Sequence, residues 1–141
     1  MEITYKDFNI LSENQVKALY EDLGWSSYTK NIKKLLSGIQ NSSFVYSAWD
    51  KNTLVGLIRV LSDGHTISYI QDILVKKDYQ GQGIGRYLME VTLKKYKAVR
   101  QIVLTTDMTG PGDFYQKFGF KEVKKYDCKT YLKIQGDNDN E

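Results

Sequence analysis

A turn with three glycines at alternate positions, set between an apolar stretch and an amphipathic one, constrains the fold more than any other feature. Ile73–Val75 is apolar, the turn holds Gly81, Gly83 and Gly85, and apolar residues then recur with helical spacing at Ile84, Leu88, Val91 and Ala98. This pattern predicts a buried strand, a tight turn and a helix over about 83–97. The first turn of a helix carries unpaired N–H groups and partial positive charge, so this turn suits an anion such as phosphate.

The spacing of these glycines excludes two common phosphate-binding loops. A P-loop needs Gly-Lys-Ser/Thr, which does not follow here. A dinucleotide-binding fingerprint would need a third glycine where Arg86 or Leu88 stands. Lys76, Lys77 and Arg86 could add charge-assisted contacts to a phosphate. A solvated glycine-rich connection with basic neighbours is the alternative interpretation.

Periodic patterns along the rest of the chain predict a mixed α/β (α+β) fold. The expected strands cover 2–8, 44–49, 54–61, 66–75, 101–106 and part of 122–134, and the expected helices cover 13–23, 29–40, 83–97 and 113–118. The order is therefore β-α-α-β-β-β-α-β-α-β. The strand–helix–strand run across 66–106 predicts one parallel pair in a mixed sheet.

Length and composition exclude several classes of protein. The 141 residues fit one domain, expected over 1–134, with a disordered tail over 135–141. The net charge of +3 comes without a basic run, which argues against nucleic acid as the main partner. One histidine and one cysteine do not fit a zinc site or an internal disulfide, so no metal is expected.

No apolar run approaches about 18 residues, so we expect no membrane span. With no signal peptide and a lone thiol, we expect a cytoplasmic protein.

Two motifs make the chain similar to the GCN5-related N-acetyltransferases (GNATs). Gln80-x-x-Gly83-x-Gly85 matches that family's Gln/Arg-x-x-Gly-x-Gly/Ala loop, and residues 113–120 resemble its Phe-Tyr-x-x-x-Gly-Phe helix end. The resemblance covers about residues 2–134 and implies a mixed, mostly antiparallel central sheet of 6–7 strands with about four helices. It also implies acetyl-CoA as cosubstrate, with the pyrophosphate on the backbone amides of Gln80, Gly81, Gln82, Gly83, Ile84, Gly85 and Arg86.

The same resemblance assigns roles around the thioester. Tyr115 would lie beside the sulfur, where a phenol with a pKa of about 10 can protonate the leaving thiolate; a packing tyrosine is the alternative. The donor to the thioester carbonyl would be the backbone at Leu74 or Val75, where the family's strand carries a bulge. Asp107 stands near a family asparagine that contacts the cofactor, but an ionised carboxylate cannot donate hydrogen bonds.

Asp72 is the candidate general base, because it stands among apolar residues of a predicted strand. A carboxylate in such a place needs a partner or a raised pKa. The alternative is a structural carboxylate that binds a nearby backbone group or lysine. His65 could titrate in a useful range, but it lies at a predicted hairpin turn.

The acceptor is the least constrained part of the prediction. Trp25 and Tyr28 lie between the first two helices, where the family forms its acceptor wall, and aromatic rings near carboxylates suit a small organic ammonium unless they are core. Residues 55–64 resemble a subgroup that includes chloroplast serotonin acetyltransferases, which favours a small amine. The alternatives are a protein lysine or N-terminal acetyltransferase and a CoA-binding regulator without turnover. Dimers are common in the family, which favours a homodimer.

Overall fold

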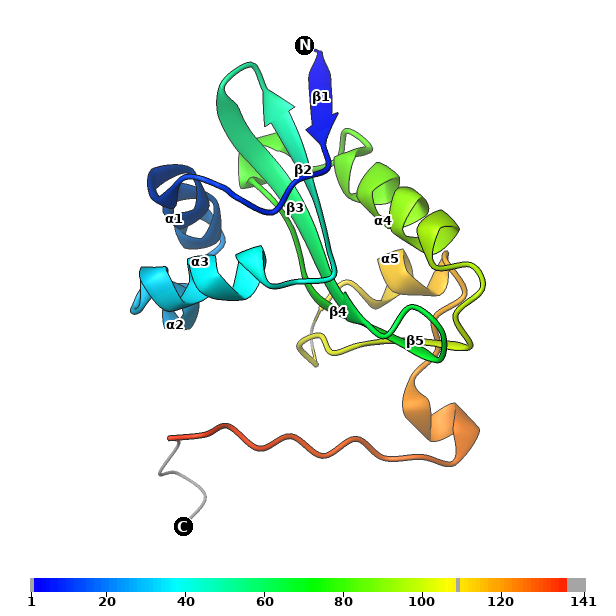
Figure 1. Cartoon of the computed structure of the whole chain (residues 1–141). Helices are drawn as coiled ribbons and strands as arrows, with labels where there is room; N and C mark the ends of the chain where they lie inside the picture. Colours follow the sequence, from blue (N-terminus) through cyan, green and yellow to red (C-terminus); the bar gives the residue numbers. More distant parts are fainter. Residues whose placement is uncertain (1, 109, 137–141) are drawn as a thin grey trace. The chain divides into compact units, whose positions relative to one another are not determined.

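The computed structural model describes residues 2–108 and 110–136 (Figure 1). Contacts within the chain divide it into two units, one ending at Thr105 and one beginning at Thr106. The predicted tail over 135–141 lies, from residue 137 onward, outside the described residues.

The first unit is built on one five-stranded sheet in the order β1-β2-β3-β4-β5. Three antiparallel pairs join the first four strands, and β4 pairs with β5 in parallel. The strands are β1 (Ile3–Lys6), β2 (Phe44–Asp50), β3 (Thr53–Ser62), β4 (Ile67–Val75) and β5 (Gln101–Leu104). The predicted α+β class and the one parallel pair are confirmed.

Helices cover both faces of this sheet, with α1, α2 and α3 on one face and α4 on the other (Figure 1). They are α1 (Glu13–Asp22), α2 (Ser26–Thr29), α3 (Ile32–Gln40) and α4 (Ile84–Lys95). Because it is covered on both faces, β3 is buried at every residue from Leu54 to Val60. The helix predicted over 29–40 is divided, because Asn31 caps α3 by accepting a hydrogen bond from the Lys34 N–H at 3.2 Å.

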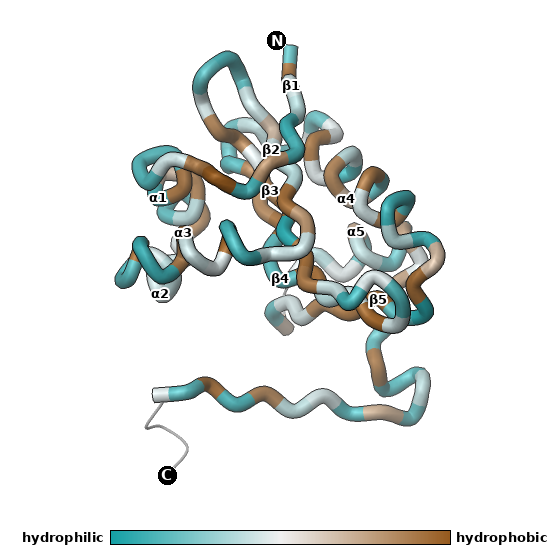
Figure 2. Tube along the Cα trace, viewed as in Figure 1, coloured by the Kyte–Doolittle hydropathy of each residue, from teal (hydrophilic) through white to brown (hydrophobic). Residues whose placement is uncertain are grey.

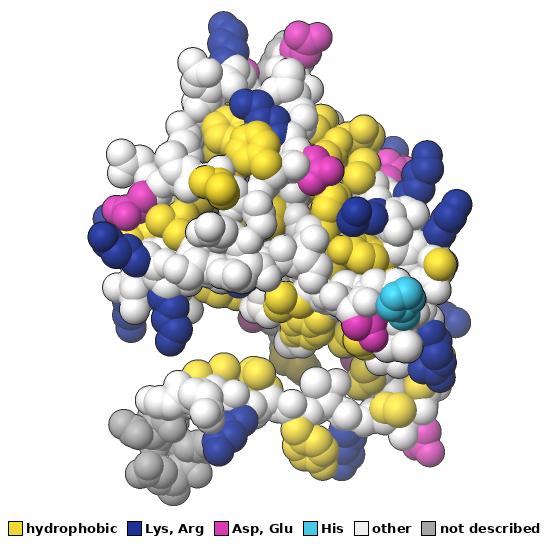
Figure 3. Space-filling model, viewed as in Figure 1, with side chains coloured by type: hydrophobic (Ala, Val, Ile, Leu, Met, Phe, Trp, Pro, Cys, Tyr) yellow, Lys and Arg dark blue, Asp and Glu magenta, His cyan; other side chains and the backbone are white. Residues whose placement is uncertain are grey.

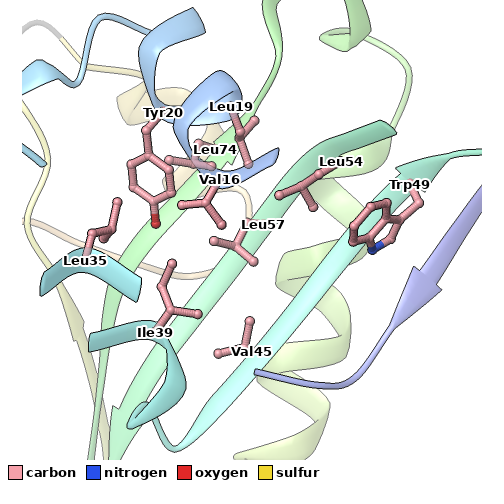
Figure 4. Close-up of a cluster of buried hydrophobic side chains, with 10 residues drawn as sticks. All are labelled: Val16, Leu19, Tyr20, Leu35, Ile39, Val45, Trp49, Leu54, Leu57 and Leu74. Carbon is pink, nitrogen blue, oxygen red and sulfur yellow. The ribbon is translucent and has the colours of Figure 1, made fainter. Parts of the chain in front are cut away.

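The core between the sheet and the first helices is one cluster of buried side chains (Figure 4). Val16, Leu19 and Tyr20 come from α1, and each is 0% exposed. The other members come from α3 and the strands: Leu35, Ile39, Val45, Trp49, Leu54, Leu57 and Leu74. Burial of this apolar surface holds α1 and α3 on the sheet. The side chain of Gln15 adds two hydrogen bonds between α1 and the sheet, because it donates to the Asn52 carbonyl and accepts from the Leu54 N–H.

The second unit differs most from the prediction. It holds α5 (Gly112–Gln116) and the 3₁₀ helix η2 (Val123–Tyr126), and none of its described residues forms a strand. The strand expected within 122–134 is therefore wrong. Within the described residues the sheet has five strands rather than 6–7, and there are five α-helices where about four were expected. The stretch after η2 does alternate hydrophobic and hydrophilic residues (Figure 2). Its side chains are exposed, with Tyr131 at 88% and Leu132 at 76% (Figure 3). Alternation supplies one face of a strand but not the partner that its backbone needs.

Candidate active site

The glycine-rich loop runs from the end of β4 through the 3₁₀ helix η1 (Lys77–Tyr79) into α4. Gly81 and Gly83 have φ values of 79° and 87°, a left-handed conformation that disfavours residues with a Cβ. Gly83 is the N-cap of α4 and no side chain caps the helix. An added Cβ at either glycine would meet nothing within 4 Å. The glycines therefore serve the shape of the loop and leave its outer surface open.

The backbone N–H groups of this loop are available to a ligand. Within the described part of the chain, none of the N–H groups of residues 81–86 donates a hydrogen bond to a protein acceptor. Residues 80–83 and Arg86 are exposed, and Ile84 is buried against the sheet. Gly56 on β3 permits this close packing, because a Cβ there would lie 3.2 Å from Cγ2 of Ile84. The sheet thus fixes the helix terminus, and the loop residues just before it are exposed.

Four hydrogen bonds, made by three residues, hold the segment that leads into these amides. The side chain of Gln80 donates to the carbonyl of Val75 at 2.9 Å, and the Gln80 N–H is itself bonded to Lys77. The Tyr79 hydroxyl donates to Asp50 at 2.7 Å. The N–H of Lys77 donates to the carboxylate of Asp22, at the end of α1, at 2.8 Å. Gln80 therefore shapes the loop, and the free amides begin at residue 81.

The pairing of β4 with β5 ends where the candidate site begins. Their ladder pairs Ile67–Ile70 with Gln101–Leu104, but β4 continues to Val75. Within the described residues, the β5-facing edge of residues 71–75 therefore has no strand partner. Leu74 and Val75, the predicted donors to a carbonyl, lie on this stretch. The bulge lies earlier than predicted: Asp72 pairs with Arg59 and Ile70 with Val60, which leaves Gln71 without an opposite residue.

Asp72 is at the centre of a buried polar network. Its side chain is 1% exposed, and the Arg59 Nε donates to its Oδ2 at 2.5 Å. The Tyr20 hydroxyl also donates to Oδ2, at 2.9 Å, and the Tyr28 hydroxyl donates to Oδ1 at 2.8 Å. Gln71 donates from Nε2 to the Tyr28 oxygen at 2.7 Å. The partner of the carboxylate is thus an arginine and two phenols rather than a lysine.

Burial and the nearby carboxylate of Asp72 raise the pKa of both phenols, that of Tyr20 well above its ordinary value. Both therefore stay protonated at neutral pH. The pKa of Arg59 is also raised: burial acts most strongly and lowers it, but the charge and hydrogen bond of Asp72, with the two nearby phenols, together outweigh burial. The carboxylate, the guanidinium and the two neutral phenols together carry no net charge.

The aromatic residues expected at the acceptor wall join this network. Trp25 packs on Tyr20 and Tyr28, with ring centroids 6.0 Å and 6.1 Å away. Tyr20 is wholly buried (Figure 4), whereas Trp25 and Tyr28 are half-buried. The structure thus brings together the predicted base, Asp72, and the predicted acceptor residues, Trp25 and Tyr28.

Tyr115 lies on α5 in the second unit. Its ring packs against Phe114 and Phe120 at 5.3 Å and 6.2 Å, and Gly119 turns the chain with a φ of 90°. Burial raises the pKa of Tyr115, an effect that the Thr106 side chain opposes. The phenol is therefore protonated at neutral pH. Asp107 is exposed, and its carbonyl accepts the Gly110 N–H at 2.8 Å.

The sequence model of the Acetyltransferase (GNAT) domain family matches residues 3–135. This chain belongs to the GNAT acetyltransferase family. A GNAT family acetyltransferase of Streptococcus pneumoniae has 34% identity and a TM-score of 0.83, over 96% of this chain and 100% of that one. A probable acetyltransferase of Staphylococcus aureus has 30% identity and a TM-score of 0.79, over 94% of this chain and all of that one.

Curated relatives give the same family. An uncharacterized N-acetyltransferase of the red alga Gracilaria tenuistipitata is 31% identical over 123 residues, which are 82% of this chain and 66% of that protein. That of Porphyra purpurea is 30% identical over 75% of this chain and 63% of the relative. The chain thus spans slightly less than two thirds of the length of these curated relatives.

Sequence reasoning missed three residues of the acetyltransferase's polar network: Tyr20, Arg59 and Gln71. Arg59 carried the same signal as Asp72, because it is a charged residue within a predicted apolar strand. Gln71 carried no such signal. Tyr20 is close in sequence to the predicted acceptor wall, but nothing indicated its bond to Asp72, since a tyrosine on an amphipathic helix is ordinarily core. Among the described residues, no group of three histidine, cysteine, aspartate or glutamate side chains is arranged to hold a metal ion. In the same residues no helix is long and apolar enough to cross a bilayer.

Proposed function

We propose that this acetyltransferase moves the acetyl group of acetyl-CoA to the primary amine of a small molecule, by direct attack in a ternary complex. The observation that carries the proposal is the row of unpartnered N–H groups at residues 81–86, at the N-terminus of α4. Such a terminus favours negative charge through its free donors and its dipole.

The residues of the loop fit a diphosphate. Gly81 and Gly83 leave open space where a side chain would otherwise stand. Lys76 is half-buried and Lys77 and Arg86 are exposed at the same loop, so their charges add to the attraction. A structure with the same fold, that of AAC(6')-Iy at 13% identity and a TM-score of 0.66, was solved with a bisubstrate analogue that contains CoA.

The chemistry needs two proton transfers, and the chain offers a candidate group for each. Acetyl-CoA supplies an acyl group activated as a thioester. The acceptor ammonium must lose a proton before its nitrogen forms the new C–N bond, and Asp72 is the proposed destination of that proton. As the C–S bond breaks, Tyr115 gives its proton to the sulfur and regains one from water. Its raised pKa suits this role because the phenol is protonated when needed.

Backbone donors on β4 complete the proposed site. The carbonyl oxygen of the thioester gains negative charge during attack, and an N–H group directed at it stabilises that charge. Leu74 and Val75 belong to the part of β4 that runs past β5. An N–H on this edge costs no reorganisation, because the strand is already held on its other side by β3.

The preference for a small amine rests on the half-buried rings of Trp25 and Tyr28 beside Asp72.

An assay that follows release of the CoA thiol tests the proposal, with acetyl-CoA and three acceptors: 2-phenylethylamine, spermidine and a lysine-containing peptide. We expect turnover with one or both small amines. Turnover with the peptide alone would instead indicate a protein acetyltransferase. CoA binding without turnover on any acceptor would indicate a CoA-binding regulator.

A further inference from the structure

The hydroxyl of Tyr28 contacts β4 just after the pairing of β4 with β5 ends. Its two hydrogen-bond partners, Gln71 and Asp72, are the first residues of β4 beyond the last pair of the parallel ladder, Ile70 with Leu104. The residues that follow, up to Val75, are those proposed to face the thioester. Tyr28 therefore stands next to the reacting groups of the proposed function, on which this inference rests.

Asp72 cannot meet an acceptor directly. Its side chain is 1% exposed, and its two oxygens already accept three hydrogen bonds from the protein. Tyr20, which also binds the carboxylate, is 0% exposed. Tyr28 is the only one of the three donors to Asp72 that is not buried, and it lies on α2, a short helix with no buried residue. Among the three described donors to this carboxylate, Tyr28 is therefore the one that a ligand can reach.

The hydrogen bonds around Tyr28 fix the direction in which its oxygen can bind. The phenol has one proton, which it uses to donate a hydrogen bond to the carboxylate of Asp72. A carboxylate can only accept hydrogen bonds, so the phenol cannot donate elsewhere. Gln71 donates to one lone pair of the phenol oxygen. The remaining lone pair can only accept a hydrogen bond. A group that donates N–H therefore fits this position, and a carboxylate or phosphate oxygen does not.

We propose that Tyr28 is the residue that selects the acceptor amine, by accepting a hydrogen bond from its N–H, and that Asp72 and Gln71 are positioning residues that hold the phenol oxygen in this state. Since Arg59 balances the charge of Asp72, selection works through hydrogen-bond direction rather than net charge. The same contacts form a proton path. The ammonium proton passes to the Tyr28 oxygen while the Tyr28 proton passes to Oδ1 of Asp72, which leaves a neutral amine, an unchanged tyrosine and a protonated carboxyl.

Tyr28→Phe tests this selection, because it removes the hydroxyl and keeps the ring. With 2-phenylethylamine and acetyl-CoA as substrates, we expect the KM for the amine to rise at least tenfold and the KM for acetyl-CoA to change less than twofold. Tyr69→Phe is the matched control. It removes a hydroxyl that donates to Thr105 at 2.8 Å from within the paired part of β4, and it should change neither KM more than twofold.

Tyr20→Phe separates selection from simple bracing of Asp72, because it removes a hydrogen bond to the same carboxylate from a hydroxyl that no ligand reaches. We expect it to lower the melting temperature but to raise the amine KM less than threefold. Equal rises in Tyr20→Phe and Tyr28→Phe, or no rise in Tyr28→Phe, would overturn the proposal.

The test also holds if 2-phenylethylamine is not acetylated. Its binding to the CoA complex is then measured by calorimetry, and so is that of its N,N,N-trimethyl analogue, which keeps the positive charge but has no N–H. We expect the wild type to bind the primary amine more tightly, and Tyr28→Phe to reduce this preference at least fivefold. Binding without such a change overturns the role of Tyr28 while leaving acetyl transfer to other amines open. If neither compound binds to the CoA complex, the proposed role of Tyr28 is overturned as well.

Discussion

Arg59 and Asp72 lie opposite each other on β3 and β4, and their side chains form an ion pair of 2.5 Å in a place where both are nearly excluded from water. Removing one partner of such a pair leaves an uncompensated buried charge, which costs about 3–5 kcal/mol. We therefore expect Arg59→Met to lower the free energy of unfolding by about that amount.

The double variant Arg59→Met/Asp72→Leu is the control for this effect, because it removes both charges and fills their space with apolar side chains. Urea unfolding should show that it recovers most of the stability lost in the single variant, as buried pairs replaced by apolar residues often do. If the free energy of unfolding of Arg59→Met lay within about 1 kcal/mol of the wild-type value, the carboxylate of Asp72 would have found another partner.

Tyr115→Phe tests the proposed acid. Loss of a general acid typically lowers turnover by about 10² or more, so we expect kcat to fall by roughly that factor while CoA affinity stays within about threefold. Tyr126→Phe, on the 63% exposed tyrosine of the same unit, should behave as the wild type. Equal losses of kcat and CoA affinity in Tyr115→Phe would instead identify a packing residue.

The turn between β3 and β4 depends on an ionised side chain. Oδ1 of Asp63 accepts the N–H groups of His65, Thr66 and Ile67 at 2.8, 2.7 and 3.1 Å. The hydrogen bond from the Thr66 hydroxyl first, and then these backbone bonds, hold the pKa of Asp63 well below its usual value. The pKa is lowered in the folded state, so the charged form stabilises the fold above about pH 4, and this contribution is lost as pH falls further.

Asp63→Asn should therefore lower the melting temperature most above about pH 5, and the difference from the wild type should shrink between about pH 4 and pH 2. Thermal unfolding across this range measures it. A difference that is constant with pH would show that the carboxylate's charge does not matter to the turn.

Local patterns predicted the parts of the fold that local physics decides. The helix over 13–23, the strand into Val75 and the glycine turn each follow from nearby residues, and the structure has α1, β4 and α4 where they were expected. The division of the second helix at Asn31 was missed, because a capping asparagine inside an amphipathic pattern looks like a solvent-facing residue.

Contacts between residues far apart in the sequence could not be predicted from it. Nothing in the spacing of Tyr20, Arg59 and Asp72 shows that they converge, since pairing of β3 with β4 and docking of α1 bring them together. The stretch after η2 was predicted as a strand from its alternation alone, and a strand also needs a neighbour. The sequence therefore predicted the glycine-rich loop and the helix after it more completely than the surroundings of Asp72.

Binding of CoA to the wild type, Gly83→Ala and Gly64→Ala, followed by calorimetry, tests the central claim most directly. Both glycines have left-handed φ values, 87° and 79°, and a Cβ at either meets no protein atom within 4 Å, so the two substitutions should cost similar stability, about 1–2 kcal/mol. Gly64 lies in the turn between β3 and β4, away from the loop. We predict one CoA bound per wild-type chain, the same affinity within about twofold in Gly64→Ala, and at least tenfold weaker binding in Gly83→Ala. No binding to the wild type, or equal affinity in both variants, would contradict a diphosphate held by the amides of residues 81–86.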